Sequence, residues 1–94
     1  MSTKTSGTAP IATVDDDAVE LIPAQAGQTH RHLKIVNQGA EPGFYKIGAG
    51  GESNRIPADF FFTDDEILIA EDEAVFIQRV AGGANMTDVF GSIW

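Results

Sequence analysis

The stretch LKIVNQGAEPGFYKIG, residues 33–48, decides the fold class. Each of its apolar ends is typical of a short β-strand, and the Gly and Pro residues between them favour a connection. Leu33 and Ile35 alternate with His32 and Lys34. Because successive side chains of a strand point to opposite faces, we expect Leu33 and Ile35 in the core, and His32 and Lys34 facing solvent or a partner.

Similar short runs precede and follow this stretch at a spacing of roughly 8–12 residues, which is typical of a β-sandwich. The runs cover residues 11–14, 18–22, 30–36, 44–47, 60–62, 67–70, 74–80 and 86–94. They predict an all-β fold, a small antiparallel β-sandwich or jelly-roll-like barrel of about seven or eight short strands. A helix over residues 65–77 is the competing interpretation. We favour strands because β-branched residues dominate there and the acidic residues 71–73 interrupt the helical pattern.

With 94 residues the chain can form one modest core, and it has no Cys to add a disulfide. No large apolar residue follows Met1 within the first ten positions. This composition predicts a flexible N-terminal arm over residues 1–10 and a single β-sandwich domain over residues 11–94. Oligomerisation is a common way for so small a domain to bury more area.

The net charge of −8 argues against a nucleic-acid partner, because an acidic surface repels a phosphate backbone. No apolar run reaches the roughly 18 residues that a membrane-spanning helix needs, so we expect no membrane partner. The N-terminal residues also lack the apolar segment of a signal peptide, and we therefore expect synthesis in the cytoplasm.

Nine of the 14 acidic residues fall in three triplets at predicted turns, residues 15–17, 64–66 and 71–73. Clustered carboxylates are the ligands that calcium prefers. The alternative is that the triplets solvate the turns and discourage edge pairing. We favour this alternative because the EF-hand order of ligands is missing, and we expect no metal.

His30 and His32 are two residues apart in a predicted strand, which places both imidazoles on one face. Zinc would need a further ligand that the spacing does not identify, so exposed strand residues are the favoured interpretation. With Arg31 and Lys34, the two His gather within five positions of an otherwise acidic chain. This basic segment could also dock on an acidic partner.

No catalytic nucleophile is identified. None of the Ser residues lies in a Gly-x-Ser-x-Gly elbow. The Gly-rich residues 48–51 are not followed by the Lys and Ser/Thr of a phosphate-binding loop. We therefore expect neither an enzyme nor a cofactor.

The aromatic residues indicate an interface. Residues 60–62 are three consecutive Phe, so a strand must turn at least one ring away from the core. Further along the chain, Phe90 and Trp94 share one strand face, while Val89 and Ile93 share the other. Phe and Trp are enriched in subunit contacts, although the sandwich could also wrap these rings itself.

Four segments carry a family resemblance: ELIPA (residues 20–24), LKIVNQG (33–39), PGFYKIG (42–48) and AVFI (74–77). They resemble small β-sandwich virion proteins of tailed bacteriophages, in which an LxIxNxG strand and a VYxxxG strand recur. The Phe cluster and the acidic triplets depart from that pattern. The resemblance implies a non-enzymatic protein that decorates and stabilises a capsid. It also implies a homo-oligomer, expected to be a trimer, that contacts the major capsid protein at the virion surface after synthesis in the host cytoplasm.

In this interpretation the arm orders against the capsid, and the basic and aromatic residues contact a subunit or another partner. The arm contacts are assigned to Thr3, Lys4, Thr5, Thr8 and Pro10. The subunit or partner contacts are assigned to His30, Arg31, His32, Lys34, Phe60, Phe61, Phe90 and Trp94.

Two other functional classes are compatible with the sequence. A receptor- or glycan-binding module of a phage tail or fibre would use Phe44, Tyr45 or an exposed ring of residues 60–62 as a stacking platform. A small metal-dependent β enzyme would be built on His30 and His32.

Overall fold

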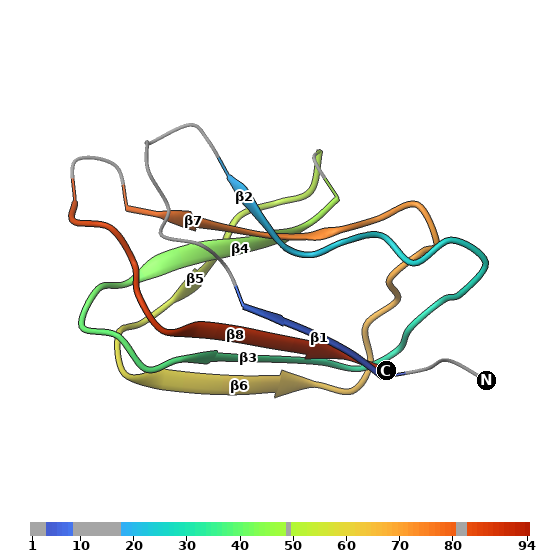
Figure 1. The fold of residues 1–94 in the computed structure, drawn as a ribbon, viewed down its shortest axis with the longest axis horizontal. Coiled ribbons are helices and arrows are strands. Elements are labelled where there is room, and N and C mark those ends of the chain that lie inside the picture. The colour runs from blue at the N-terminus through green and yellow to red at the C-terminus, as the bar shows by residue number, and fades with distance from the viewer. Residues whose placement is uncertain (1–3, 9–17, 49, 81–82) are drawn as a thin grey trace.

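A computed structural model of the chain describes residues 4–8, 18–48, 50–80 and 83–94. These residues form two packed antiparallel sheets of four strands each, which confirms the predicted all-β class (Figure 1). The strands are β1 (Thr5–Thr8), β2 (Val19–Ile22), β3 (Leu33–Asn37), β4 (Gly43–Ile47), β5 (Asn54–Ile56), β6 (Phe60–Asp64), β7 (Val75–Arg79) and β8 (Val89–Ile93). Within the described ranges, no helix is long and apolar enough to cross a membrane.

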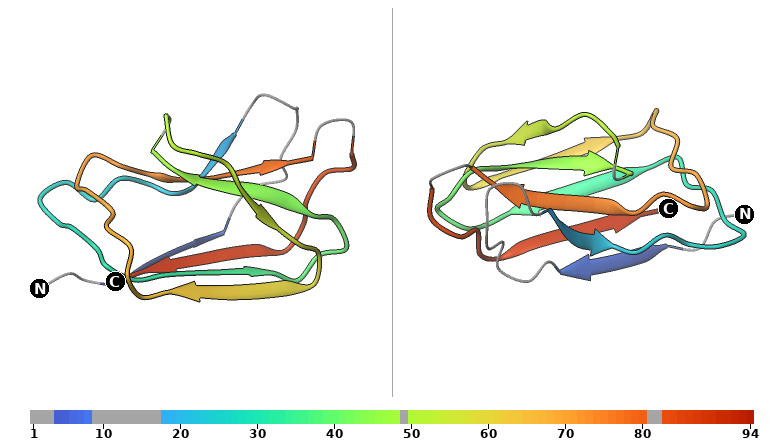
Figure 2. Two further views of the ribbon diagram at one scale, coloured as in Figure 1. Left: turned by 180° about the vertical axis from the view of Figure 1, so that it is seen from behind. Right: turned by 90° about the horizontal axis from the view of Figure 1, so that it is seen from above.

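The strand order identifies the sandwich as a jelly roll. One sheet has the order β1-β8-β3-β6 and the other the order β2-β7-β4-β5. Each strand of the first half of the chain pairs with one of the second half: β1 with β8, β2 with β7, β3 with β6 and β4 with β5. The chain is thus one long hairpin, and the additional pairs β3–β8 and β4–β7 fold it into two layers (Figure 2). This is the connectivity of a jelly roll.

The core lies between the two layers and follows the predicted alternation. Leu33 and Ile35 are fully buried while Lys34 between them is exposed. Strand β7 lies between β2 and β4, and both of its faces are at least partly covered. The core residues are Leu21, Ile22, Leu33, Ile35, Ile56, Ile69, Val75, Ile77, Met86, Val89 and Ile93.

Two strands were not expected from the sequence, and one expected strand is reduced to a single bridge. Strands β1 and β5 are short and mostly polar, and each is held by pairing with a longer neighbour, β8 or β4. Of the expected strand over residues 67–70, only Ile69 pairs, in an isolated bridge with His30. The competing helix over residues 65–77 is not present. The expected strand at residues 11–14 lies outside the described residues.

The prediction of an arm over residues 1–10 is wrong for Thr5–Thr8, which form β1 and extend the sheet at β8. Gly7 explains how a strand without large apolar side chains docks here. Its backbone lies so close to the Leu21 carbonyl oxygen of the other layer that a Cβ would clash. The folded body therefore begins before residue 11. Lys4 is described and precedes β1, while the other arm residues, including Thr3 and Pro10, lie outside the described part of the chain.

Candidate functional site

The outer face of the sheet β1-β8-β3-β6 carries a row of four side chains from separate strands, three of them apolar. Thr8 pairs with Phe90, Phe90 with Val36, and Val36 with Phe61, so the four residues form one line across the sheet. Phe61 is 64% exposed and Phe90 is 40% exposed. The neighbours of Phe90 along its strand, Val89 and Gly91, are buried, as alternation requires. We call this surface, together with the two further rows described next, the aromatic face.

The second row of the aromatic face is polar and lies next to the apolar row. It consists of Ser6, Ser92, Lys34 and Thr63, which pair across the same four strands. The hydroxyl oxygens of Ser6 and Ser92 are hydrogen-bonded at 2.9 Å. The Lys34 ammonium lies 5.9 Å from the centre of the Phe61 ring, within the range of a cation–π contact.

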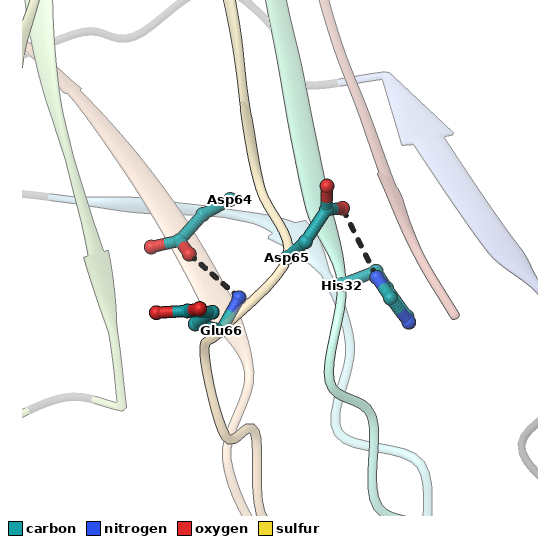
Figure 3. Close-up of polar contacts among 4 residues, drawn as sticks. All are labelled: His32, Asp64, Asp65 and Glu66. Carbon is teal, nitrogen blue, oxygen red and sulfur yellow. Dashed lines mark hydrogen bonds and ion pairs between the residues drawn. The ribbon is translucent and has the colours of Figure 1, made fainter.

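The third row lies at the strand ends and combines two rings with two charged groups. The His32 imidazole stacks on the Trp94 indole with centroids 5.2 Å apart, and the Lys4 ammonium lies 5.6 Å from the centre of the indole. His32 Nδ1 is 3.0 Å from Asp65 Oδ1, and Figure 3 shows the Asp65 carboxylate turned toward the imidazole. These contacts orient His32 and Trp94 on the surface.

The acidic residues around this row form a turn. In Figure 3 the Asp64 carboxylate lies away from His32 and accepts a hydrogen bond from the backbone N–H of Glu66 at 3.0 Å. At the second described triplet, Glu73 Oε1 accepts from the backbone N–H of Ala70 at 2.9 Å. Both triplets therefore serve turns, as the favoured interpretation predicts. The described residues contain no group of three potential metal ligands, and the triplet at residues 15–17 lies outside them.

A shallow pocket of about 160 Å³ lies beside Val36 and Phe61 of the apolar row. Phe60, which is 45% exposed, contributes to it together with Phe61 and Val36. Small-molecule sites usually enclose roughly 300–1,000 Å³, so the pocket suits a single side chain of a protein partner better than a ligand. The remaining lining residues are Asn37, Gln38 and Asp59.

Asn37 supports this end of the face and was not singled out from the sequence. Its side chain is buried, and its Nδ2 donates to the carbonyl oxygens of Glu41 and Pro57 at 2.9 and 3.1 Å. Its Oδ1 accepts from the backbone N–H of Gly39 at 3.1 Å. The amide thus ties together the turn after β3 and the segment before β6. In the sequence, the Asn-x-Gly spacing after a predicted strand indicates such a turn, in which the Asn side chain bonds to the backbone two residues on.

The assignment of His30 to an exposed interface is wrong, because its side chain is only 1% exposed. The backbone bridge with Ile69 places His30 inside the sandwich before β3 begins. His30 and His32 therefore do not share an exposed strand face. Arg31 and Lys34 are exposed, and His32 is partly exposed, so these three predicted residues are accessible.

The opposite outer face, on the sheet β2-β7-β4-β5, differs from the aromatic face. Its Phe44 and Phe76 are half-buried, and long polar or charged side chains pair with both. Phe76 pairs with Glu20 and Lys46, and Phe44 with Gln78 and Arg55. Large exposed rings are therefore a property of the aromatic face and of Phe60 beside it.

Tyr45, one of the rings that a glycan-binding interpretation offers as a stacking platform, is partly buried. It packs against the core, and its ring stacks on Phe62 with centroids 4.8 Å apart. Burial, and to a smaller extent the nearby Asp64 carboxylate, raises the pKa of Tyr45 above its ordinary value of 10.0. Ionisation of the phenol is therefore less favourable in the folded protein than in the unfolded chain.

The aromatic face thus offers apolar rings, hydroxyls and two lysines on one sheet surface, an arrangement suited to binding another macromolecular surface. Of the residues assigned to the partner interface, it unites His32, Lys34, Phe61, Phe90 and Trp94. From the predicted arm it includes Lys4 and Thr8. No family model, curated protein or solved structure matches this chain.

Proposed function

We propose that this chain is a non-enzymatic structural protein of a virion, which attaches to the capsid through its aromatic face and assembles as a homo-oligomer. The observation that carries the proposal is the row of Phe90, Val36 and Phe61 across three paired strands, with both rings exposed. Apolar side chains aligned on a rigid sheet present an interface that needs little rearrangement to bind.

The energy available from this row is considerable. Burying a Phe side chain that is otherwise exposed contributes about 1.5–3 kcal/mol. Phe61 and Phe90 flank Val36, and a cluster of adjacent apolar side chains is typical of the centre of an interface. Leu68 is similarly exposed, at 60%, but it does not belong to the row. A single scattered apolar residue of that kind is normal on a protein surface.

The charge of the aromatic face favours an acidic partner surface. The face carries Lys4 and Lys34 against one carboxylate, Asp65, whereas the whole chain has a net charge of −8. Complementary charge steers association and excludes partners of the wrong sign. We assign the major capsid protein as this partner, with the chain at the capsid surface after synthesis in the host cytoplasm.

The assignment to a virion is supported by the resemblance of residues 20–24, 33–39, 42–48 and 74–77 to phage β-sandwich virion proteins. The jelly-roll connectivity is compatible with it, since viral capsid domains share this architecture with lectins and cupins. A fold alone does not select a function, so the aromatic face and the sequence resemblance carry the proposal. The proposed assembly is a trimer, in which several weak attachment faces would act together.

The role is tested on particles purified from a phage whose genome encodes this chain. Quantitative mass spectrometry should find the protein in many copies per particle, and cryo-electron microscopy should find it on the outer surface. Particles produced without it should lose their genome at a lower temperature. Its absence from purified particles, or its presence only in the infected-cell lysate, would contradict the proposal.

A further inference from the structure

The two sheets differ in how their edges are protected. In the sheet β2-β7-β4-β5, the outer strand β2 has a register irregularity between Glu20 and Ile22 and is followed directly by Pro23. The other outer strand, β5, has only three residues and is followed directly by Pro57. Bulges, short length and Pro are devices that stop a sheet edge from pairing with another chain.

The sheet that carries the aromatic face has neither a bulge nor a Pro in its outer strands. Its outer strands β1 and β6 pair with β8 and β3 over four and five residues without a register shift. Neither contains Pro, and β6 has the sequence FFFTD, in which the only charged residue is the last. Among the residues that the structure describes, no strand pairs with the outer edge of either one. Such edges are ready to accept a further strand.

The two open edges are also complementary to each other. Each strand of the order β1-β8-β3-β6 is antiparallel to its neighbour, so β1 and β6 run in opposite directions. Ser6 and Thr63 lie at opposite ends of the same row. In the row of His32 and Trp94, Lys4 lies at the β1 edge and Asp65 at the β6 edge. The two edges therefore carry opposite charges in the same row of side chains.

We propose that copies of this chain join head to tail, with β6 of one copy pairing antiparallel with β1 of the next. This arrangement rests on the proposed homo-oligomeric assembly and not on attachment to a capsid. Continuation of the rows places Thr63 against Ser6 of the partner subunit and Asp65 beside Lys4 of the partner subunit. All aromatic faces then lie on one side of a continuous sheet. Contacts of this heterologous kind close into rings or extend as filaments.

Disulfide trapping tests the register directly, because the chain has no Cys. Ser6→Cys and Thr63→Cys are made as separate proteins, mixed and oxidised. Each variant then has a single Cys, so a disulfide between positions 6 and 63 can form only between two copies. We expect a mixed dimer in high yield from the two proteins together, and little from Ser53→Cys mixed with Thr63→Cys.

A charge exchange tests the second contact by sedimentation velocity over a range of protein concentrations. Lys4→Glu and Asp65→Lys should each weaken association by roughly two- to fivefold, and the double variant should restore it. Arg55→Glu and Asp72→Lys change the net charge equally at exposed sites elsewhere and should have smaller effects.

Oligomers that give no link between positions 6 and 63, or that link position 63 to itself, would overturn the head-to-tail register and leave the proposed homo-oligomer standing. A chain that stays monomeric at all concentrations would overturn both. Attachment to capsids is measured separately and is not decided by either result.

Discussion

The imidazole of His32 and the indole of Trp94 lie almost parallel, with planes inclined by 9° and centroids 5.2 Å apart. The backbones of the same two residues are also joined, because His32 N–H donates to the Trp94 carbonyl at 3.0 Å and Trp94 N–H donates to the His32 carbonyl at 3.2 Å. The stack thus fastens the end of β8 to the start of β3. It also supplies the ring over which the Lys4 ammonium lies.

Replacing Trp94 with Ala should lower the free energy of unfolding by about 1–2 kcal/mol, because the stack and the cation–π contact are both lost. Trp94→Phe retains a ring for His32 and should cost less. Urea denaturation followed by circular dichroism measures both variants. Equal stability of Trp94→Ala and the unmodified protein would show that the stack does not hold the end of β8.

The docking of β1 predicts a strong effect at Gly7. A Val side chain there would clash with the Leu21 carbonyl oxygen, so Gly7→Val should destabilise the fold by about 1–3 kcal/mol. Gly50→Val is the matched control, because a Cβ at that position meets no atom within 4 Å. Thermal unfolding compares the two. If Gly7→Val melted at the temperature of the Gly50 variant, β1 would not be packed against the second sheet.

The raised pKa of Tyr45 predicts a loss of folding stability at alkaline pH. Its folded pKa is raised by burial and by Asp64, so above pH 10.0, the ordinary pKa, the unfolded chain ionises before the folded protein does. The stabilisation is therefore complete below the unfolded pKa and is lost as the pH rises toward the folded pKa. Tyr45→Phe should show a weaker fall in stability over this pH range, since the remaining alkaline groups titrate in both proteins. Parallel curves for the two proteins would contradict the partial burial of the phenol.

The strands with regular alternation could be predicted from the sequence, and the polar strands could not. Leu33 and Ile35 are in the core because their apolar side chains alternate with Lys34. Strand β1, TSGT, has no apolar periodicity and forms through its pairing with β8. The same holds for β5, whose three residues NRI depend on β4. Pairing between distant segments is not encoded in a local pattern.

The candidate site could be predicted only in part, for the same reason. Three consecutive Phe residues predict that at least one ring of residues 60–62 leaves the core, and the apolar residues on both faces of residues 89–94 indicate an interface for Phe90. Their alignment through Val36 depends on the register of three strands, which a single sequence does not specify. His30 was misplaced because its burial results from a bridge with Ile69, 39 positions further along the chain.

The exposed row should contribute little to folding. Phe61→Ser should change the free energy of unfolding by no more than about 0.5 kcal/mol, because its ring is largely in contact with solvent. Ile35→Ala, on the inner face of the neighbouring strand, should cost about 2–5 kcal/mol through lost burial and a cavity. Chemical denaturation distinguishes the two. A large loss at Phe61 would mean that the ring serves the fold rather than a partner.

The most direct measurement of the central claim is cosedimentation of the purified protein with capsids that lack it. The double variant Phe61→Ser/Phe90→Ser should bind at least tenfold more weakly than the unmodified protein, as expected when about 1.4 kcal/mol or more of interface energy is lost. Leu68→Ser removes an apolar side chain that is 60% exposed and lies outside the aromatic face, and this variant should bind normally. Unchanged binding of the double variant, or an equal loss with Leu68→Ser, would contradict attachment through the aromatic face.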